Sequence, residues 1–266
     1  MSIAIKKIED LDPLQKLSLL DFSYSRLDTY AHAHQNIFIL IYKKNLDYLE
    51  KPQRFGNIVH AVLEKVVDKE KPLDHQEMVD EFEISKQKLD PDNKISQELI
   101  SVGRNLINEF YDQNLDTTFD VYDKEHAFSF IIGNYSMIGY IDRIDVVGDR
   151  VNIIDYKTGK WEVTQKGIAQ NLQLGIYALA ASIMMPEKEI YAELHYLRSG
   201  KRKGHLFTKE DLEDVKVRLL SLIKDIVNDN SFAATSNVRA CSYCDHAKSG
   251  ECGVGVFRNK KNHWSA

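Results

Sequence analysis

Residues 139–157 read GYIDRIDVVGDRVNIIDYK, two runs of β-branched and apolar residues that are joined by Gly148-Asp149. Such runs are typical of β-strands, and a Gly-Asp pair between two of them indicates a two-residue hairpin turn. A turn at this place puts Asp142 opposite Asp155. The same register pairs Ile144 with Ile153 and Asp145 with Asn152. The sequence therefore predicts an antiparallel β-hairpin in which two carboxylates face each other.

Opposed carboxylates on a hairpin are a candidate site for a cation. Directly opposed residues have Cβ atoms about 4.5–5.5 Å apart, and two carboxylates at this distance repel each other. A hard divalent ion such as Mg²⁺ removes the repulsion. Lys157 lies two residues after Asp155 and so on the same strand face, where an ammonium suits phosphate-ester hydrolysis.

A blander interpretation of these charges remains open. Asp142, Asp155 and Lys157 could form a solvent-facing strand surface with a cross-strand salt bridge, because charged strand faces are common. The apolar run Val151–Ile154 that precedes Asp155 favours the site instead. A carboxylate that ends such a run is costly to bury without a partner.

The remainder of the chain predicts a mixed α/β domain with a helical N-terminal part. Residues 13–115 are expected to be mainly helical, with a polar, exposed connection around residues 86–94. Apolar residues at helical or alternating spacing indicate the other elements. These are helices at 55–67, 95–111, 169–185 and 209–228, strands at 127–132, 136–147, 151–157 and 190–198, and a basic turn at 200–204.

Length and composition set broad limits on what the chain does. It has 266 residues, a formal net charge of −5 and three cysteines, all near its end. The acidic balance argues against a polycationic coat for nucleic acid, and an odd, clustered set of cysteines argues against a disulfide framework. We expect no signal peptide, no membrane span and a cytoplasmic setting. We expect a single domain over 1–266, made of a helical part (1–120), a catalytic core (121–230) and a cysteine-bearing tail (231–266).

Five segments, taken in chain order, resemble the motifs of PD-(D/E)XK nucleases of the RecB type. The central two are Gly139–Asp145, which resembles G-x-x-D-R-x-D, and Ile153–Lys160, which resembles x-x-D-Y-K-T-G. Downstream, Gln173–Tyr177 matches Q-x-x-x-Y. Upstream, Phe55–Glu64 resembles the helix that supplies a metal-binding histidine, and Ser23–Tyr30 resembles S-x-S-x-L-x-x-Y.

This resemblance implies a restriction-endonuclease-like core, a central mixed β-sheet flanked by helices, with divalent-metal chemistry. It assigns His60, Asp142, Asp155 and the backbone carbonyl of Tyr156 as ligands of Mg²⁺ or Mn²⁺. It further assigns Asp142, Asp155, Lys157, Gln173 and Tyr177 to catalysis, with Gln173 and Tyr177 helping to fix Lys157 and the DNA strand. Taken alone, His60 is also compatible with a packed helix histidine. Glu64, four residues later, either orients the His60 ring or is a surface charge.

The cysteines form a C-x2-C-x7-C pattern at Cys241, Cys244 and Cys252. It resembles the tail of an iron–sulfur subgroup found in AddB-type helicase-nucleases and CRISPR-associated relatives. That subgroup has a fourth cysteine after the S-x-S-x-L-x-x-Y segment, where this chain has Ala33-His34. Three alternatives are open: an iron–sulfur cluster, a Cys₃His site with Zn²⁺ or iron completed by His32 or His34, or metal-free thiols.

The resemblance implies a DNA exonuclease that acts on single-stranded DNA or duplex ends. Its setting would be DNA repair, recombination or CRISPR-type DNA processing. The sequence has no G-x-x-x-x-G-K-[ST] motif, so a helicase or CRISPR-type partner would be a separate chain. The alternative is a non-catalytic DNA-binding or assembly module that retains the nuclease fold.

Overall fold

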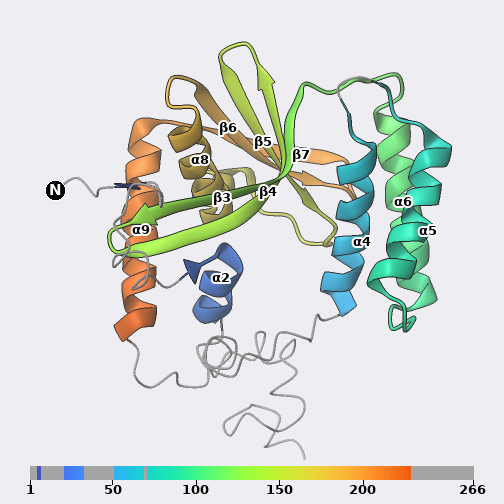
Figure 1. The fold of residues 1–266 in the computed structure, drawn as a ribbon, viewed down its shortest axis with the longest axis horizontal. Helices are drawn as coiled ribbons and strands as arrows, with labels where there is room; N and C mark the ends of the chain where they lie inside the picture. The colour runs from blue at the N-terminus through green and yellow to red at the C-terminus, as the bar shows by residue number, and fades with distance from the viewer. Residues whose placement is uncertain (1–4, 7–20, 33–50, 69–70, 229–266) are drawn as a thin grey trace, which may run out of the picture. The chain divides into compact units, whose positions relative to one another are not determined.

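The computed structural model describes residues 5–6, 21–32, 51–68 and 71–228 (Figure 1). Within them the helices are α2 (Tyr24–His32), α4 (Lys51–Val66), α5 (His75–Leu89), α6 (Gln97–Gln113), α7 (Gln165–Ile168), α8 (Leu172–Met184) and α9 (Lys209–Asn228). The strands are β1 (Ile5–Lys6), β2 (Asp21–Phe22), β3 (Val121–Ile132), β4 (Tyr135–Val147), β5 (Arg150–Lys157), β6 (Glu189–Tyr196) and β7 (Lys201–Phe207).

The strands form a mixed sheet in the order β1-β3-β4-β5-β6-β7, and β2 pairs with β4. β5 is antiparallel to β4 and parallel to β6, whereas β7 is antiparallel to β6. A parallel neighbour requires a crossover connection, which α7 and α8 provide between β5 and β6. The predicted α/β class is therefore confirmed, with a mixed sheet flanked by helices.

The chain divides into two compact units. One contains Leu49–Phe130 and Ile138–Val217, and the predicted catalytic residues and ligands of Mg²⁺ or Mn²⁺ all belong to it. The other contains Ile131–Met137 and the described residues of the ranges 4–48 and 218–228. In this second unit β1 pairs with the end of β3, and β2 pairs with the start of β4.

The core of the first unit lies against the sheet. α4, α5 and α6 lie side by side (Figure 1) and share one cluster of buried apolar side chains with Ile154 and Tyr156 of β5. α8 packs against β5 and β6. It is buried along Leu174–Ala181, as expected for a helix that is apolar on all sides.

Two segments differ from the sequence predictions. Residues 75–89 form α5, although we expected a polar connection from residue 86 onward. Its N-terminus is capped by Asp74, whose carboxylate accepts a hydrogen bond from the Glu77 N–H at 2.8 Å. The predicted basic turn at 200–204 is wrong, since residues 201–204 begin strand β7.

None of the described helices combines the length and the apolar character that crossing a membrane requires.

Candidate active site

The hairpin of β4 and β5 has the predicted register. Ile144 pairs with Ile153, Asp145 with Asn152, and Arg143 with Ile154. Just beyond this ladder, the Tyr156 N–H donates to Asp142 Oδ2 at 2.7 Å. The hairpin therefore brings Asp142 to the part of β5 that carries Asp155 and Lys157.

His60 of α4 lies beside this end of the hairpin and contacts it through both ring nitrogens. Its Nδ1 lies 3.4 Å from Asp142 Oδ1, and its Nε2 lies 2.9 Å from the Tyr156 carbonyl oxygen. Burial alone would lower the pKa of His60, but the Asp142 and Asp155 carboxylates raise it to about 9. Without a metal ion the imidazole is thus held as a cation. Of the two alternatives for Glu64, the contacts do not favour an orienting role, since Asp142 and the Tyr156 carbonyl occupy both ring nitrogens.

Lys157 is fixed by side chains from β5 and α8. Its Nζ lies 2.6 Å from Asp155 Oδ2 and donates to Gln173 Oε1 at 2.8 Å. The Gln173 amide nitrogen then donates to the Tyr177 hydroxyl at 2.9 Å. The predicted pair on α8 therefore lies on the Lys157 side of the hairpin, one helical turn apart.

The two carboxylates of the hairpin differ in electrostatics. Burial raises the pKa of Asp155 to about 6, against the opposing effect of Lys157, because only 3% of its side chain is exposed. Burial acts in the same direction on Asp142, but His60, the Tyr156 N–H and Lys157 hold the pKa of Asp142 below its usual range. Burial alone would lower the pKa of Lys157, but the Asp155 carboxylate beside it raises this pKa, so Lys157 stays an ammonium.

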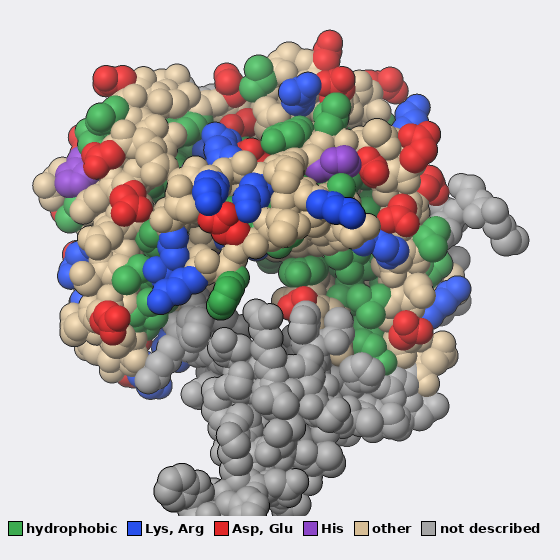
Figure 2. Space-filling view, turned by 180° about the vertical axis from the view of Figure 1, so that it is seen from behind, with side chains coloured by type: hydrophobic (Ala, Val, Ile, Leu, Met, Phe, Trp, Pro, Cys, Tyr) green, Lys and Arg blue, Asp and Glu red, His purple; other side chains and the backbone are tan. Residues whose placement is uncertain are grey.

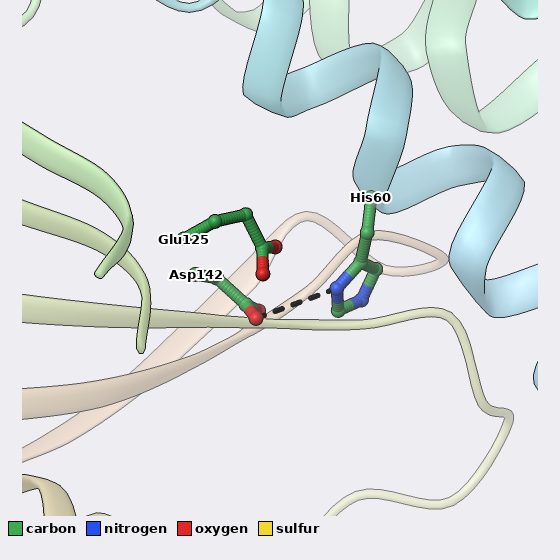
Figure 3. Close-up of side chains that lie close together, drawn as sticks. All are labelled: His60, Glu125 and Asp142. Atoms are coloured by element: carbon green, nitrogen blue, oxygen red, sulfur yellow. Dashed lines mark ion pairs between the residues drawn. The ribbon is translucent and has the colours of Figure 1, made fainter. Parts of the chain in front are cut away.

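Glu125 of β3 joins the site, although the sequence motifs did not indicate it. Ligand atoms of His60, Glu125 and Asp142 all lie within 4.8 Å of one another (Figure 3). Burial, with help from Asp142, raises the pKa of Glu125 to about 7. The feature that could have drawn attention to it is a run of four charged or titratable residues, 123–126, directly before the strand predicted at 127–132.

The donor set suits a divalent cation. Carboxylates and a backbone carbonyl are the ligands that Mg²⁺ and Mn²⁺ prefer, and an imidazole favours Mn²⁺ among these two. Asp155 Oδ2 is buried and, among the described residues, has no hydrogen-bonded partner, although Lys157 Nζ lies close to it. A buried carboxylate oxygen in this state has a free lone pair for a metal ion.

The remaining candidates do not add to this site. Cys241, Cys244, Cys252 and His34 lie outside the described residues, as does the side chain of His32. The basic residues expected in a turn at 200–204 lie in β7 and are mostly paired: Arg202 with Glu193, and Lys203 with Glu162 at 2.8 Å. Figure 2 shows basic and acidic side chains interspersed on one face of the molecule.

Residues 21–249 match the family model of the PD-(D/E)XK nuclease superfamily. A candidate exonuclease from Eubacterium rectale aligns with a TM-score of 0.51 and 10% identity, over 90% of this chain and 93% of that chain. This likeness concerns the fold alone. The structure of SSO0001 aligns at 15% identity over 80% of this chain and 93% of that chain, with a TM-score of 0.37 that is too low to compare folds. The sequence has no match among curated proteins.

Proposed function

The chain belongs to the PD-(D/E)XK nuclease superfamily, and on this basis we propose that it is a divalent-metal-dependent DNA exonuclease. The observation that carries the proposal is the set of Asp142, Asp155 and Lys157 at the end of one hairpin, with His60 beside it. A non-catalytic DNA-binding module would not be expected to place two carboxylates beside the ammonium, because carboxylates repel the phosphates of DNA unless a cation lies between them.

The protein's own residues divide the work of phosphodiester hydrolysis. His60, Asp142, Asp155 and the Tyr156 carbonyl would hold Mg²⁺ or Mn²⁺. A bound divalent ion supplies Lewis-acid stabilisation of the phosphate and lowers the pKa of a water molecule. Lys157, held by Asp155 and Gln173, presents its ammonium where it can orient the attacking water or stabilise charge on the phosphate. Tyr177 fixes the rotamer of Gln173 and thereby positions Lys157.

The choice of exonuclease action, leaving 5′-phosphate ends, rests on the motif set of the RecB type. The candidate exonuclease from Eubacterium rectale with the same fold is compatible with this choice. We place the activity in DNA repair, recombination or CRISPR-type DNA processing in the cytoplasm, with a helicase or CRISPR-type protein as a separate partner.

Visible absorbance and elemental analysis of the purified protein would distinguish an iron–sulfur cluster, zinc and metal-free thiols at the cysteine tail.

Cleavage of end-labelled DNA tests the proposal. Linear single-stranded and duplex DNA are incubated with Mg²⁺, Mn²⁺ or EDTA, beside covalently closed circular DNA of the same sequence. We expect metal-dependent shortening of the linear substrates and none of the circle. Lys157→Ala should lower the rate by about 100-fold or more, as expected for loss of a charged group at the reacting phosphate.

The matched control is Lys160→Ala, which removes an exposed lysine three residues away in the same segment. It should keep most of the activity. Folded wild-type protein that cleaves no DNA with either ion would overturn the enzyme assignment. Cleavage of the circle would replace exonuclease by endonuclease action.

A further inference from the structure

Glu125 enters the site from β3, although none of the matched motifs contains it. Figure 3 shows its carboxylate beside that of Asp142, with the His60 ring facing both. The three residues come from β3, β4 and α4, so the fold brings together groups that are far apart in the sequence. Glu64 lines the same small pocket next to His60 but is not one of the residues whose ligand atoms lie close together.

The Glu125 carboxylate lacks a partner within the part of the chain that the structure describes. It forms no ion pair there and accepts no hydrogen bond. The neighbouring Lys124 does not neutralise it, because the Lys124 ammonium donates to the Val67 carbonyl at 2.9 Å. The backbone of Glu125 has a φ of 46°, in the left-handed region that a non-glycine residue rarely adopts.

These features disfavour the metal-free fold. Glu125 is half-buried and close to the carboxylates of Asp142 and Asp155, so like charges repel where water is partly excluded, and the His60 imidazolium offsets only part of this repulsion. A divalent cation between the carboxylates would turn this repulsion into attraction. A residue with a purely structural role would instead have a partner that stabilises it without a metal.

We propose that Glu125 is a ligand of the divalent cation, beside His60 and Asp142. The inference deepens the proposed function and rests on it, because it concerns the cation of that same site. A second observation points to a cation here: Asp155 Oδ2 is almost fully buried, accepts no well-aligned hydrogen bond in the described residues, and has only the Lys157 ammonium, 2.6 Å away, to balance its charge. Glu125 would thus add a carboxylate to the ligands that the motifs supply.

Mn²⁺ binding by the full chain tests this inference without relying on activity. Titration calorimetry compares wild type, Glu125→Gln and Glu64→Gln. Each variant loses one negative charge near His60, but only Glu125→Gln loses a ligand. We expect Mn²⁺ affinity to fall by about 10-fold or more in Glu125→Gln, because losing a ligand should cost at least as much as losing a residue that only supports one. The loss in Glu64→Gln should be several times smaller.

Thermal unfolding of the same proteins gives a second readout. In EDTA, Glu125→Gln should unfold at the same temperature as wild type or higher, because the substitution removes a repelled charge and keeps the side-chain shape. Saturating Mn²⁺ should raise the unfolding temperature less in Glu125→Gln than in wild type, since stabilisation follows affinity.

Each other outcome has a defined meaning. Equal Mn²⁺ affinities for wild type and Glu125→Gln, or equal losses in the two variants, overturn the ligand role of Glu125. A lower unfolding temperature of Glu125→Gln in EDTA also overturns it, in favour of a structural role. If one of these outcomes occurs but wild type cleaves DNA and binds Mn²⁺, the proposed function stands and only the ligand role of Glu125 fails. If wild type binds no Mn²⁺, both fail.

Discussion

Arg143 is a buried cation that holds Tyr156, the residue whose backbone contacts both Asp142 and His60. Two of its guanidinium nitrogens donate to the Asp145 carboxylate at 2.8 and 2.6 Å, and a third donates to the Tyr156 hydroxyl at 2.8 Å. The guanidinium carbon also lies 4.5 Å from the centre of the Phe119 ring. Tyr156 in turn offers its N–H to Asp142 and its carbonyl to His60. Arg143 therefore positions the site through Tyr156.

Replacing Arg143 tests how much this buried network stabilises the fold. Arg143→Met leaves the buried Asp145 carboxylate without its partner, so we expect the free energy of unfolding to fall by about 3–5 kcal/mol. Arg150→Met is the control, because Arg150 pairs with Glu189 on the surface, where such a pair contributes about 0–1 kcal/mol. Urea denaturation of both variants decides the matter. Equal losses would mean that the Arg143 network adds no more than a surface pair.

Among the secondary-structure elements, α8 depends on a close approach to α9. A Cβ on Gly175 would lie 2.6 Å from a methyl group of Val215, and both residues are buried. Gly175→Val should therefore lower the free energy of unfolding by about 2 kcal/mol, because the crowding outweighs the gain in helix propensity. DNA cleavage should fall as well, since α8 carries Gln173 and Tyr177. Thermal and urea unfolding measure the first effect, and the end-labelled DNA assay measures the second.

The control for the stability effect is Gly159→Val. Nothing lies within 4 Å of a Cβ at this exposed position, so its effect should stay within about 0.5 kcal/mol. If Gly175→Val and Gly159→Val lose similar amounts of free energy of unfolding, crowding between α8 and α9 is not the reason for the loss at position 175.

Elements with a strong local signal could be predicted from the sequence, and those with a mixed signal could not. Two apolar runs around Gly148-Asp149 sufficed for the hairpin and its register, and the apolar spacing of residues 209–228 gave the bounds of α9. α5 has few buried residues on a charged helix, although Asp74 and Glu77 form a recognisable N-terminal signal. The glycines at 200 and 204 indicate a turn, yet β7 begins between them. Inside the strand, a Cβ at Gly204 would lie too close to the Tyr191 hydroxyl and to the Cβ of Glu193.

The same contrast applies to the residues of the site. Asp142, Asp155 and Lys157 follow from strand alternation within one hairpin, so local sequence suffices to group them. His60, Gln173 and Tyr177 reach the same place from two helices, and only the resemblance to a family could group them. Glu125 has neither kind of signal, because its position depends on how β3 lies beside β4 and on an unusual backbone conformation.

At the scale of the whole molecule, a buried histidine should lower the free energy of unfolding at acidic pH. His195 of β6 is buried, with ring centres 5.8 Å from Phe110 of α6 and 5.7 Å from Tyr156 of β5. Burial, together with the positive charges of Arg202 and Arg143, lowers the pKa of His195 to about 4. The contact between α6 and the sheet therefore contains a neutral imidazole at physiological pH.

A lowered pKa makes stability fall on acidification. Between pH 6.5 and about pH 4 the unfolded chain binds a proton at His195 that the folded chain does not. The free energy of unfolding should therefore fall through this window, by about 3 kcal/mol from His195 alone, and this contribution levels off below pH 4. Carboxylates also titrate here, so the quantity to measure is the difference between wild type and His195→Gln in urea denaturation at each pH. That difference in the free energy of unfolding should be constant above pH 7. As the pH falls to 4, wild type should lose more stability than His195→Gln. A constant difference over the whole range would show that the folded core accepts a charged imidazole without cost.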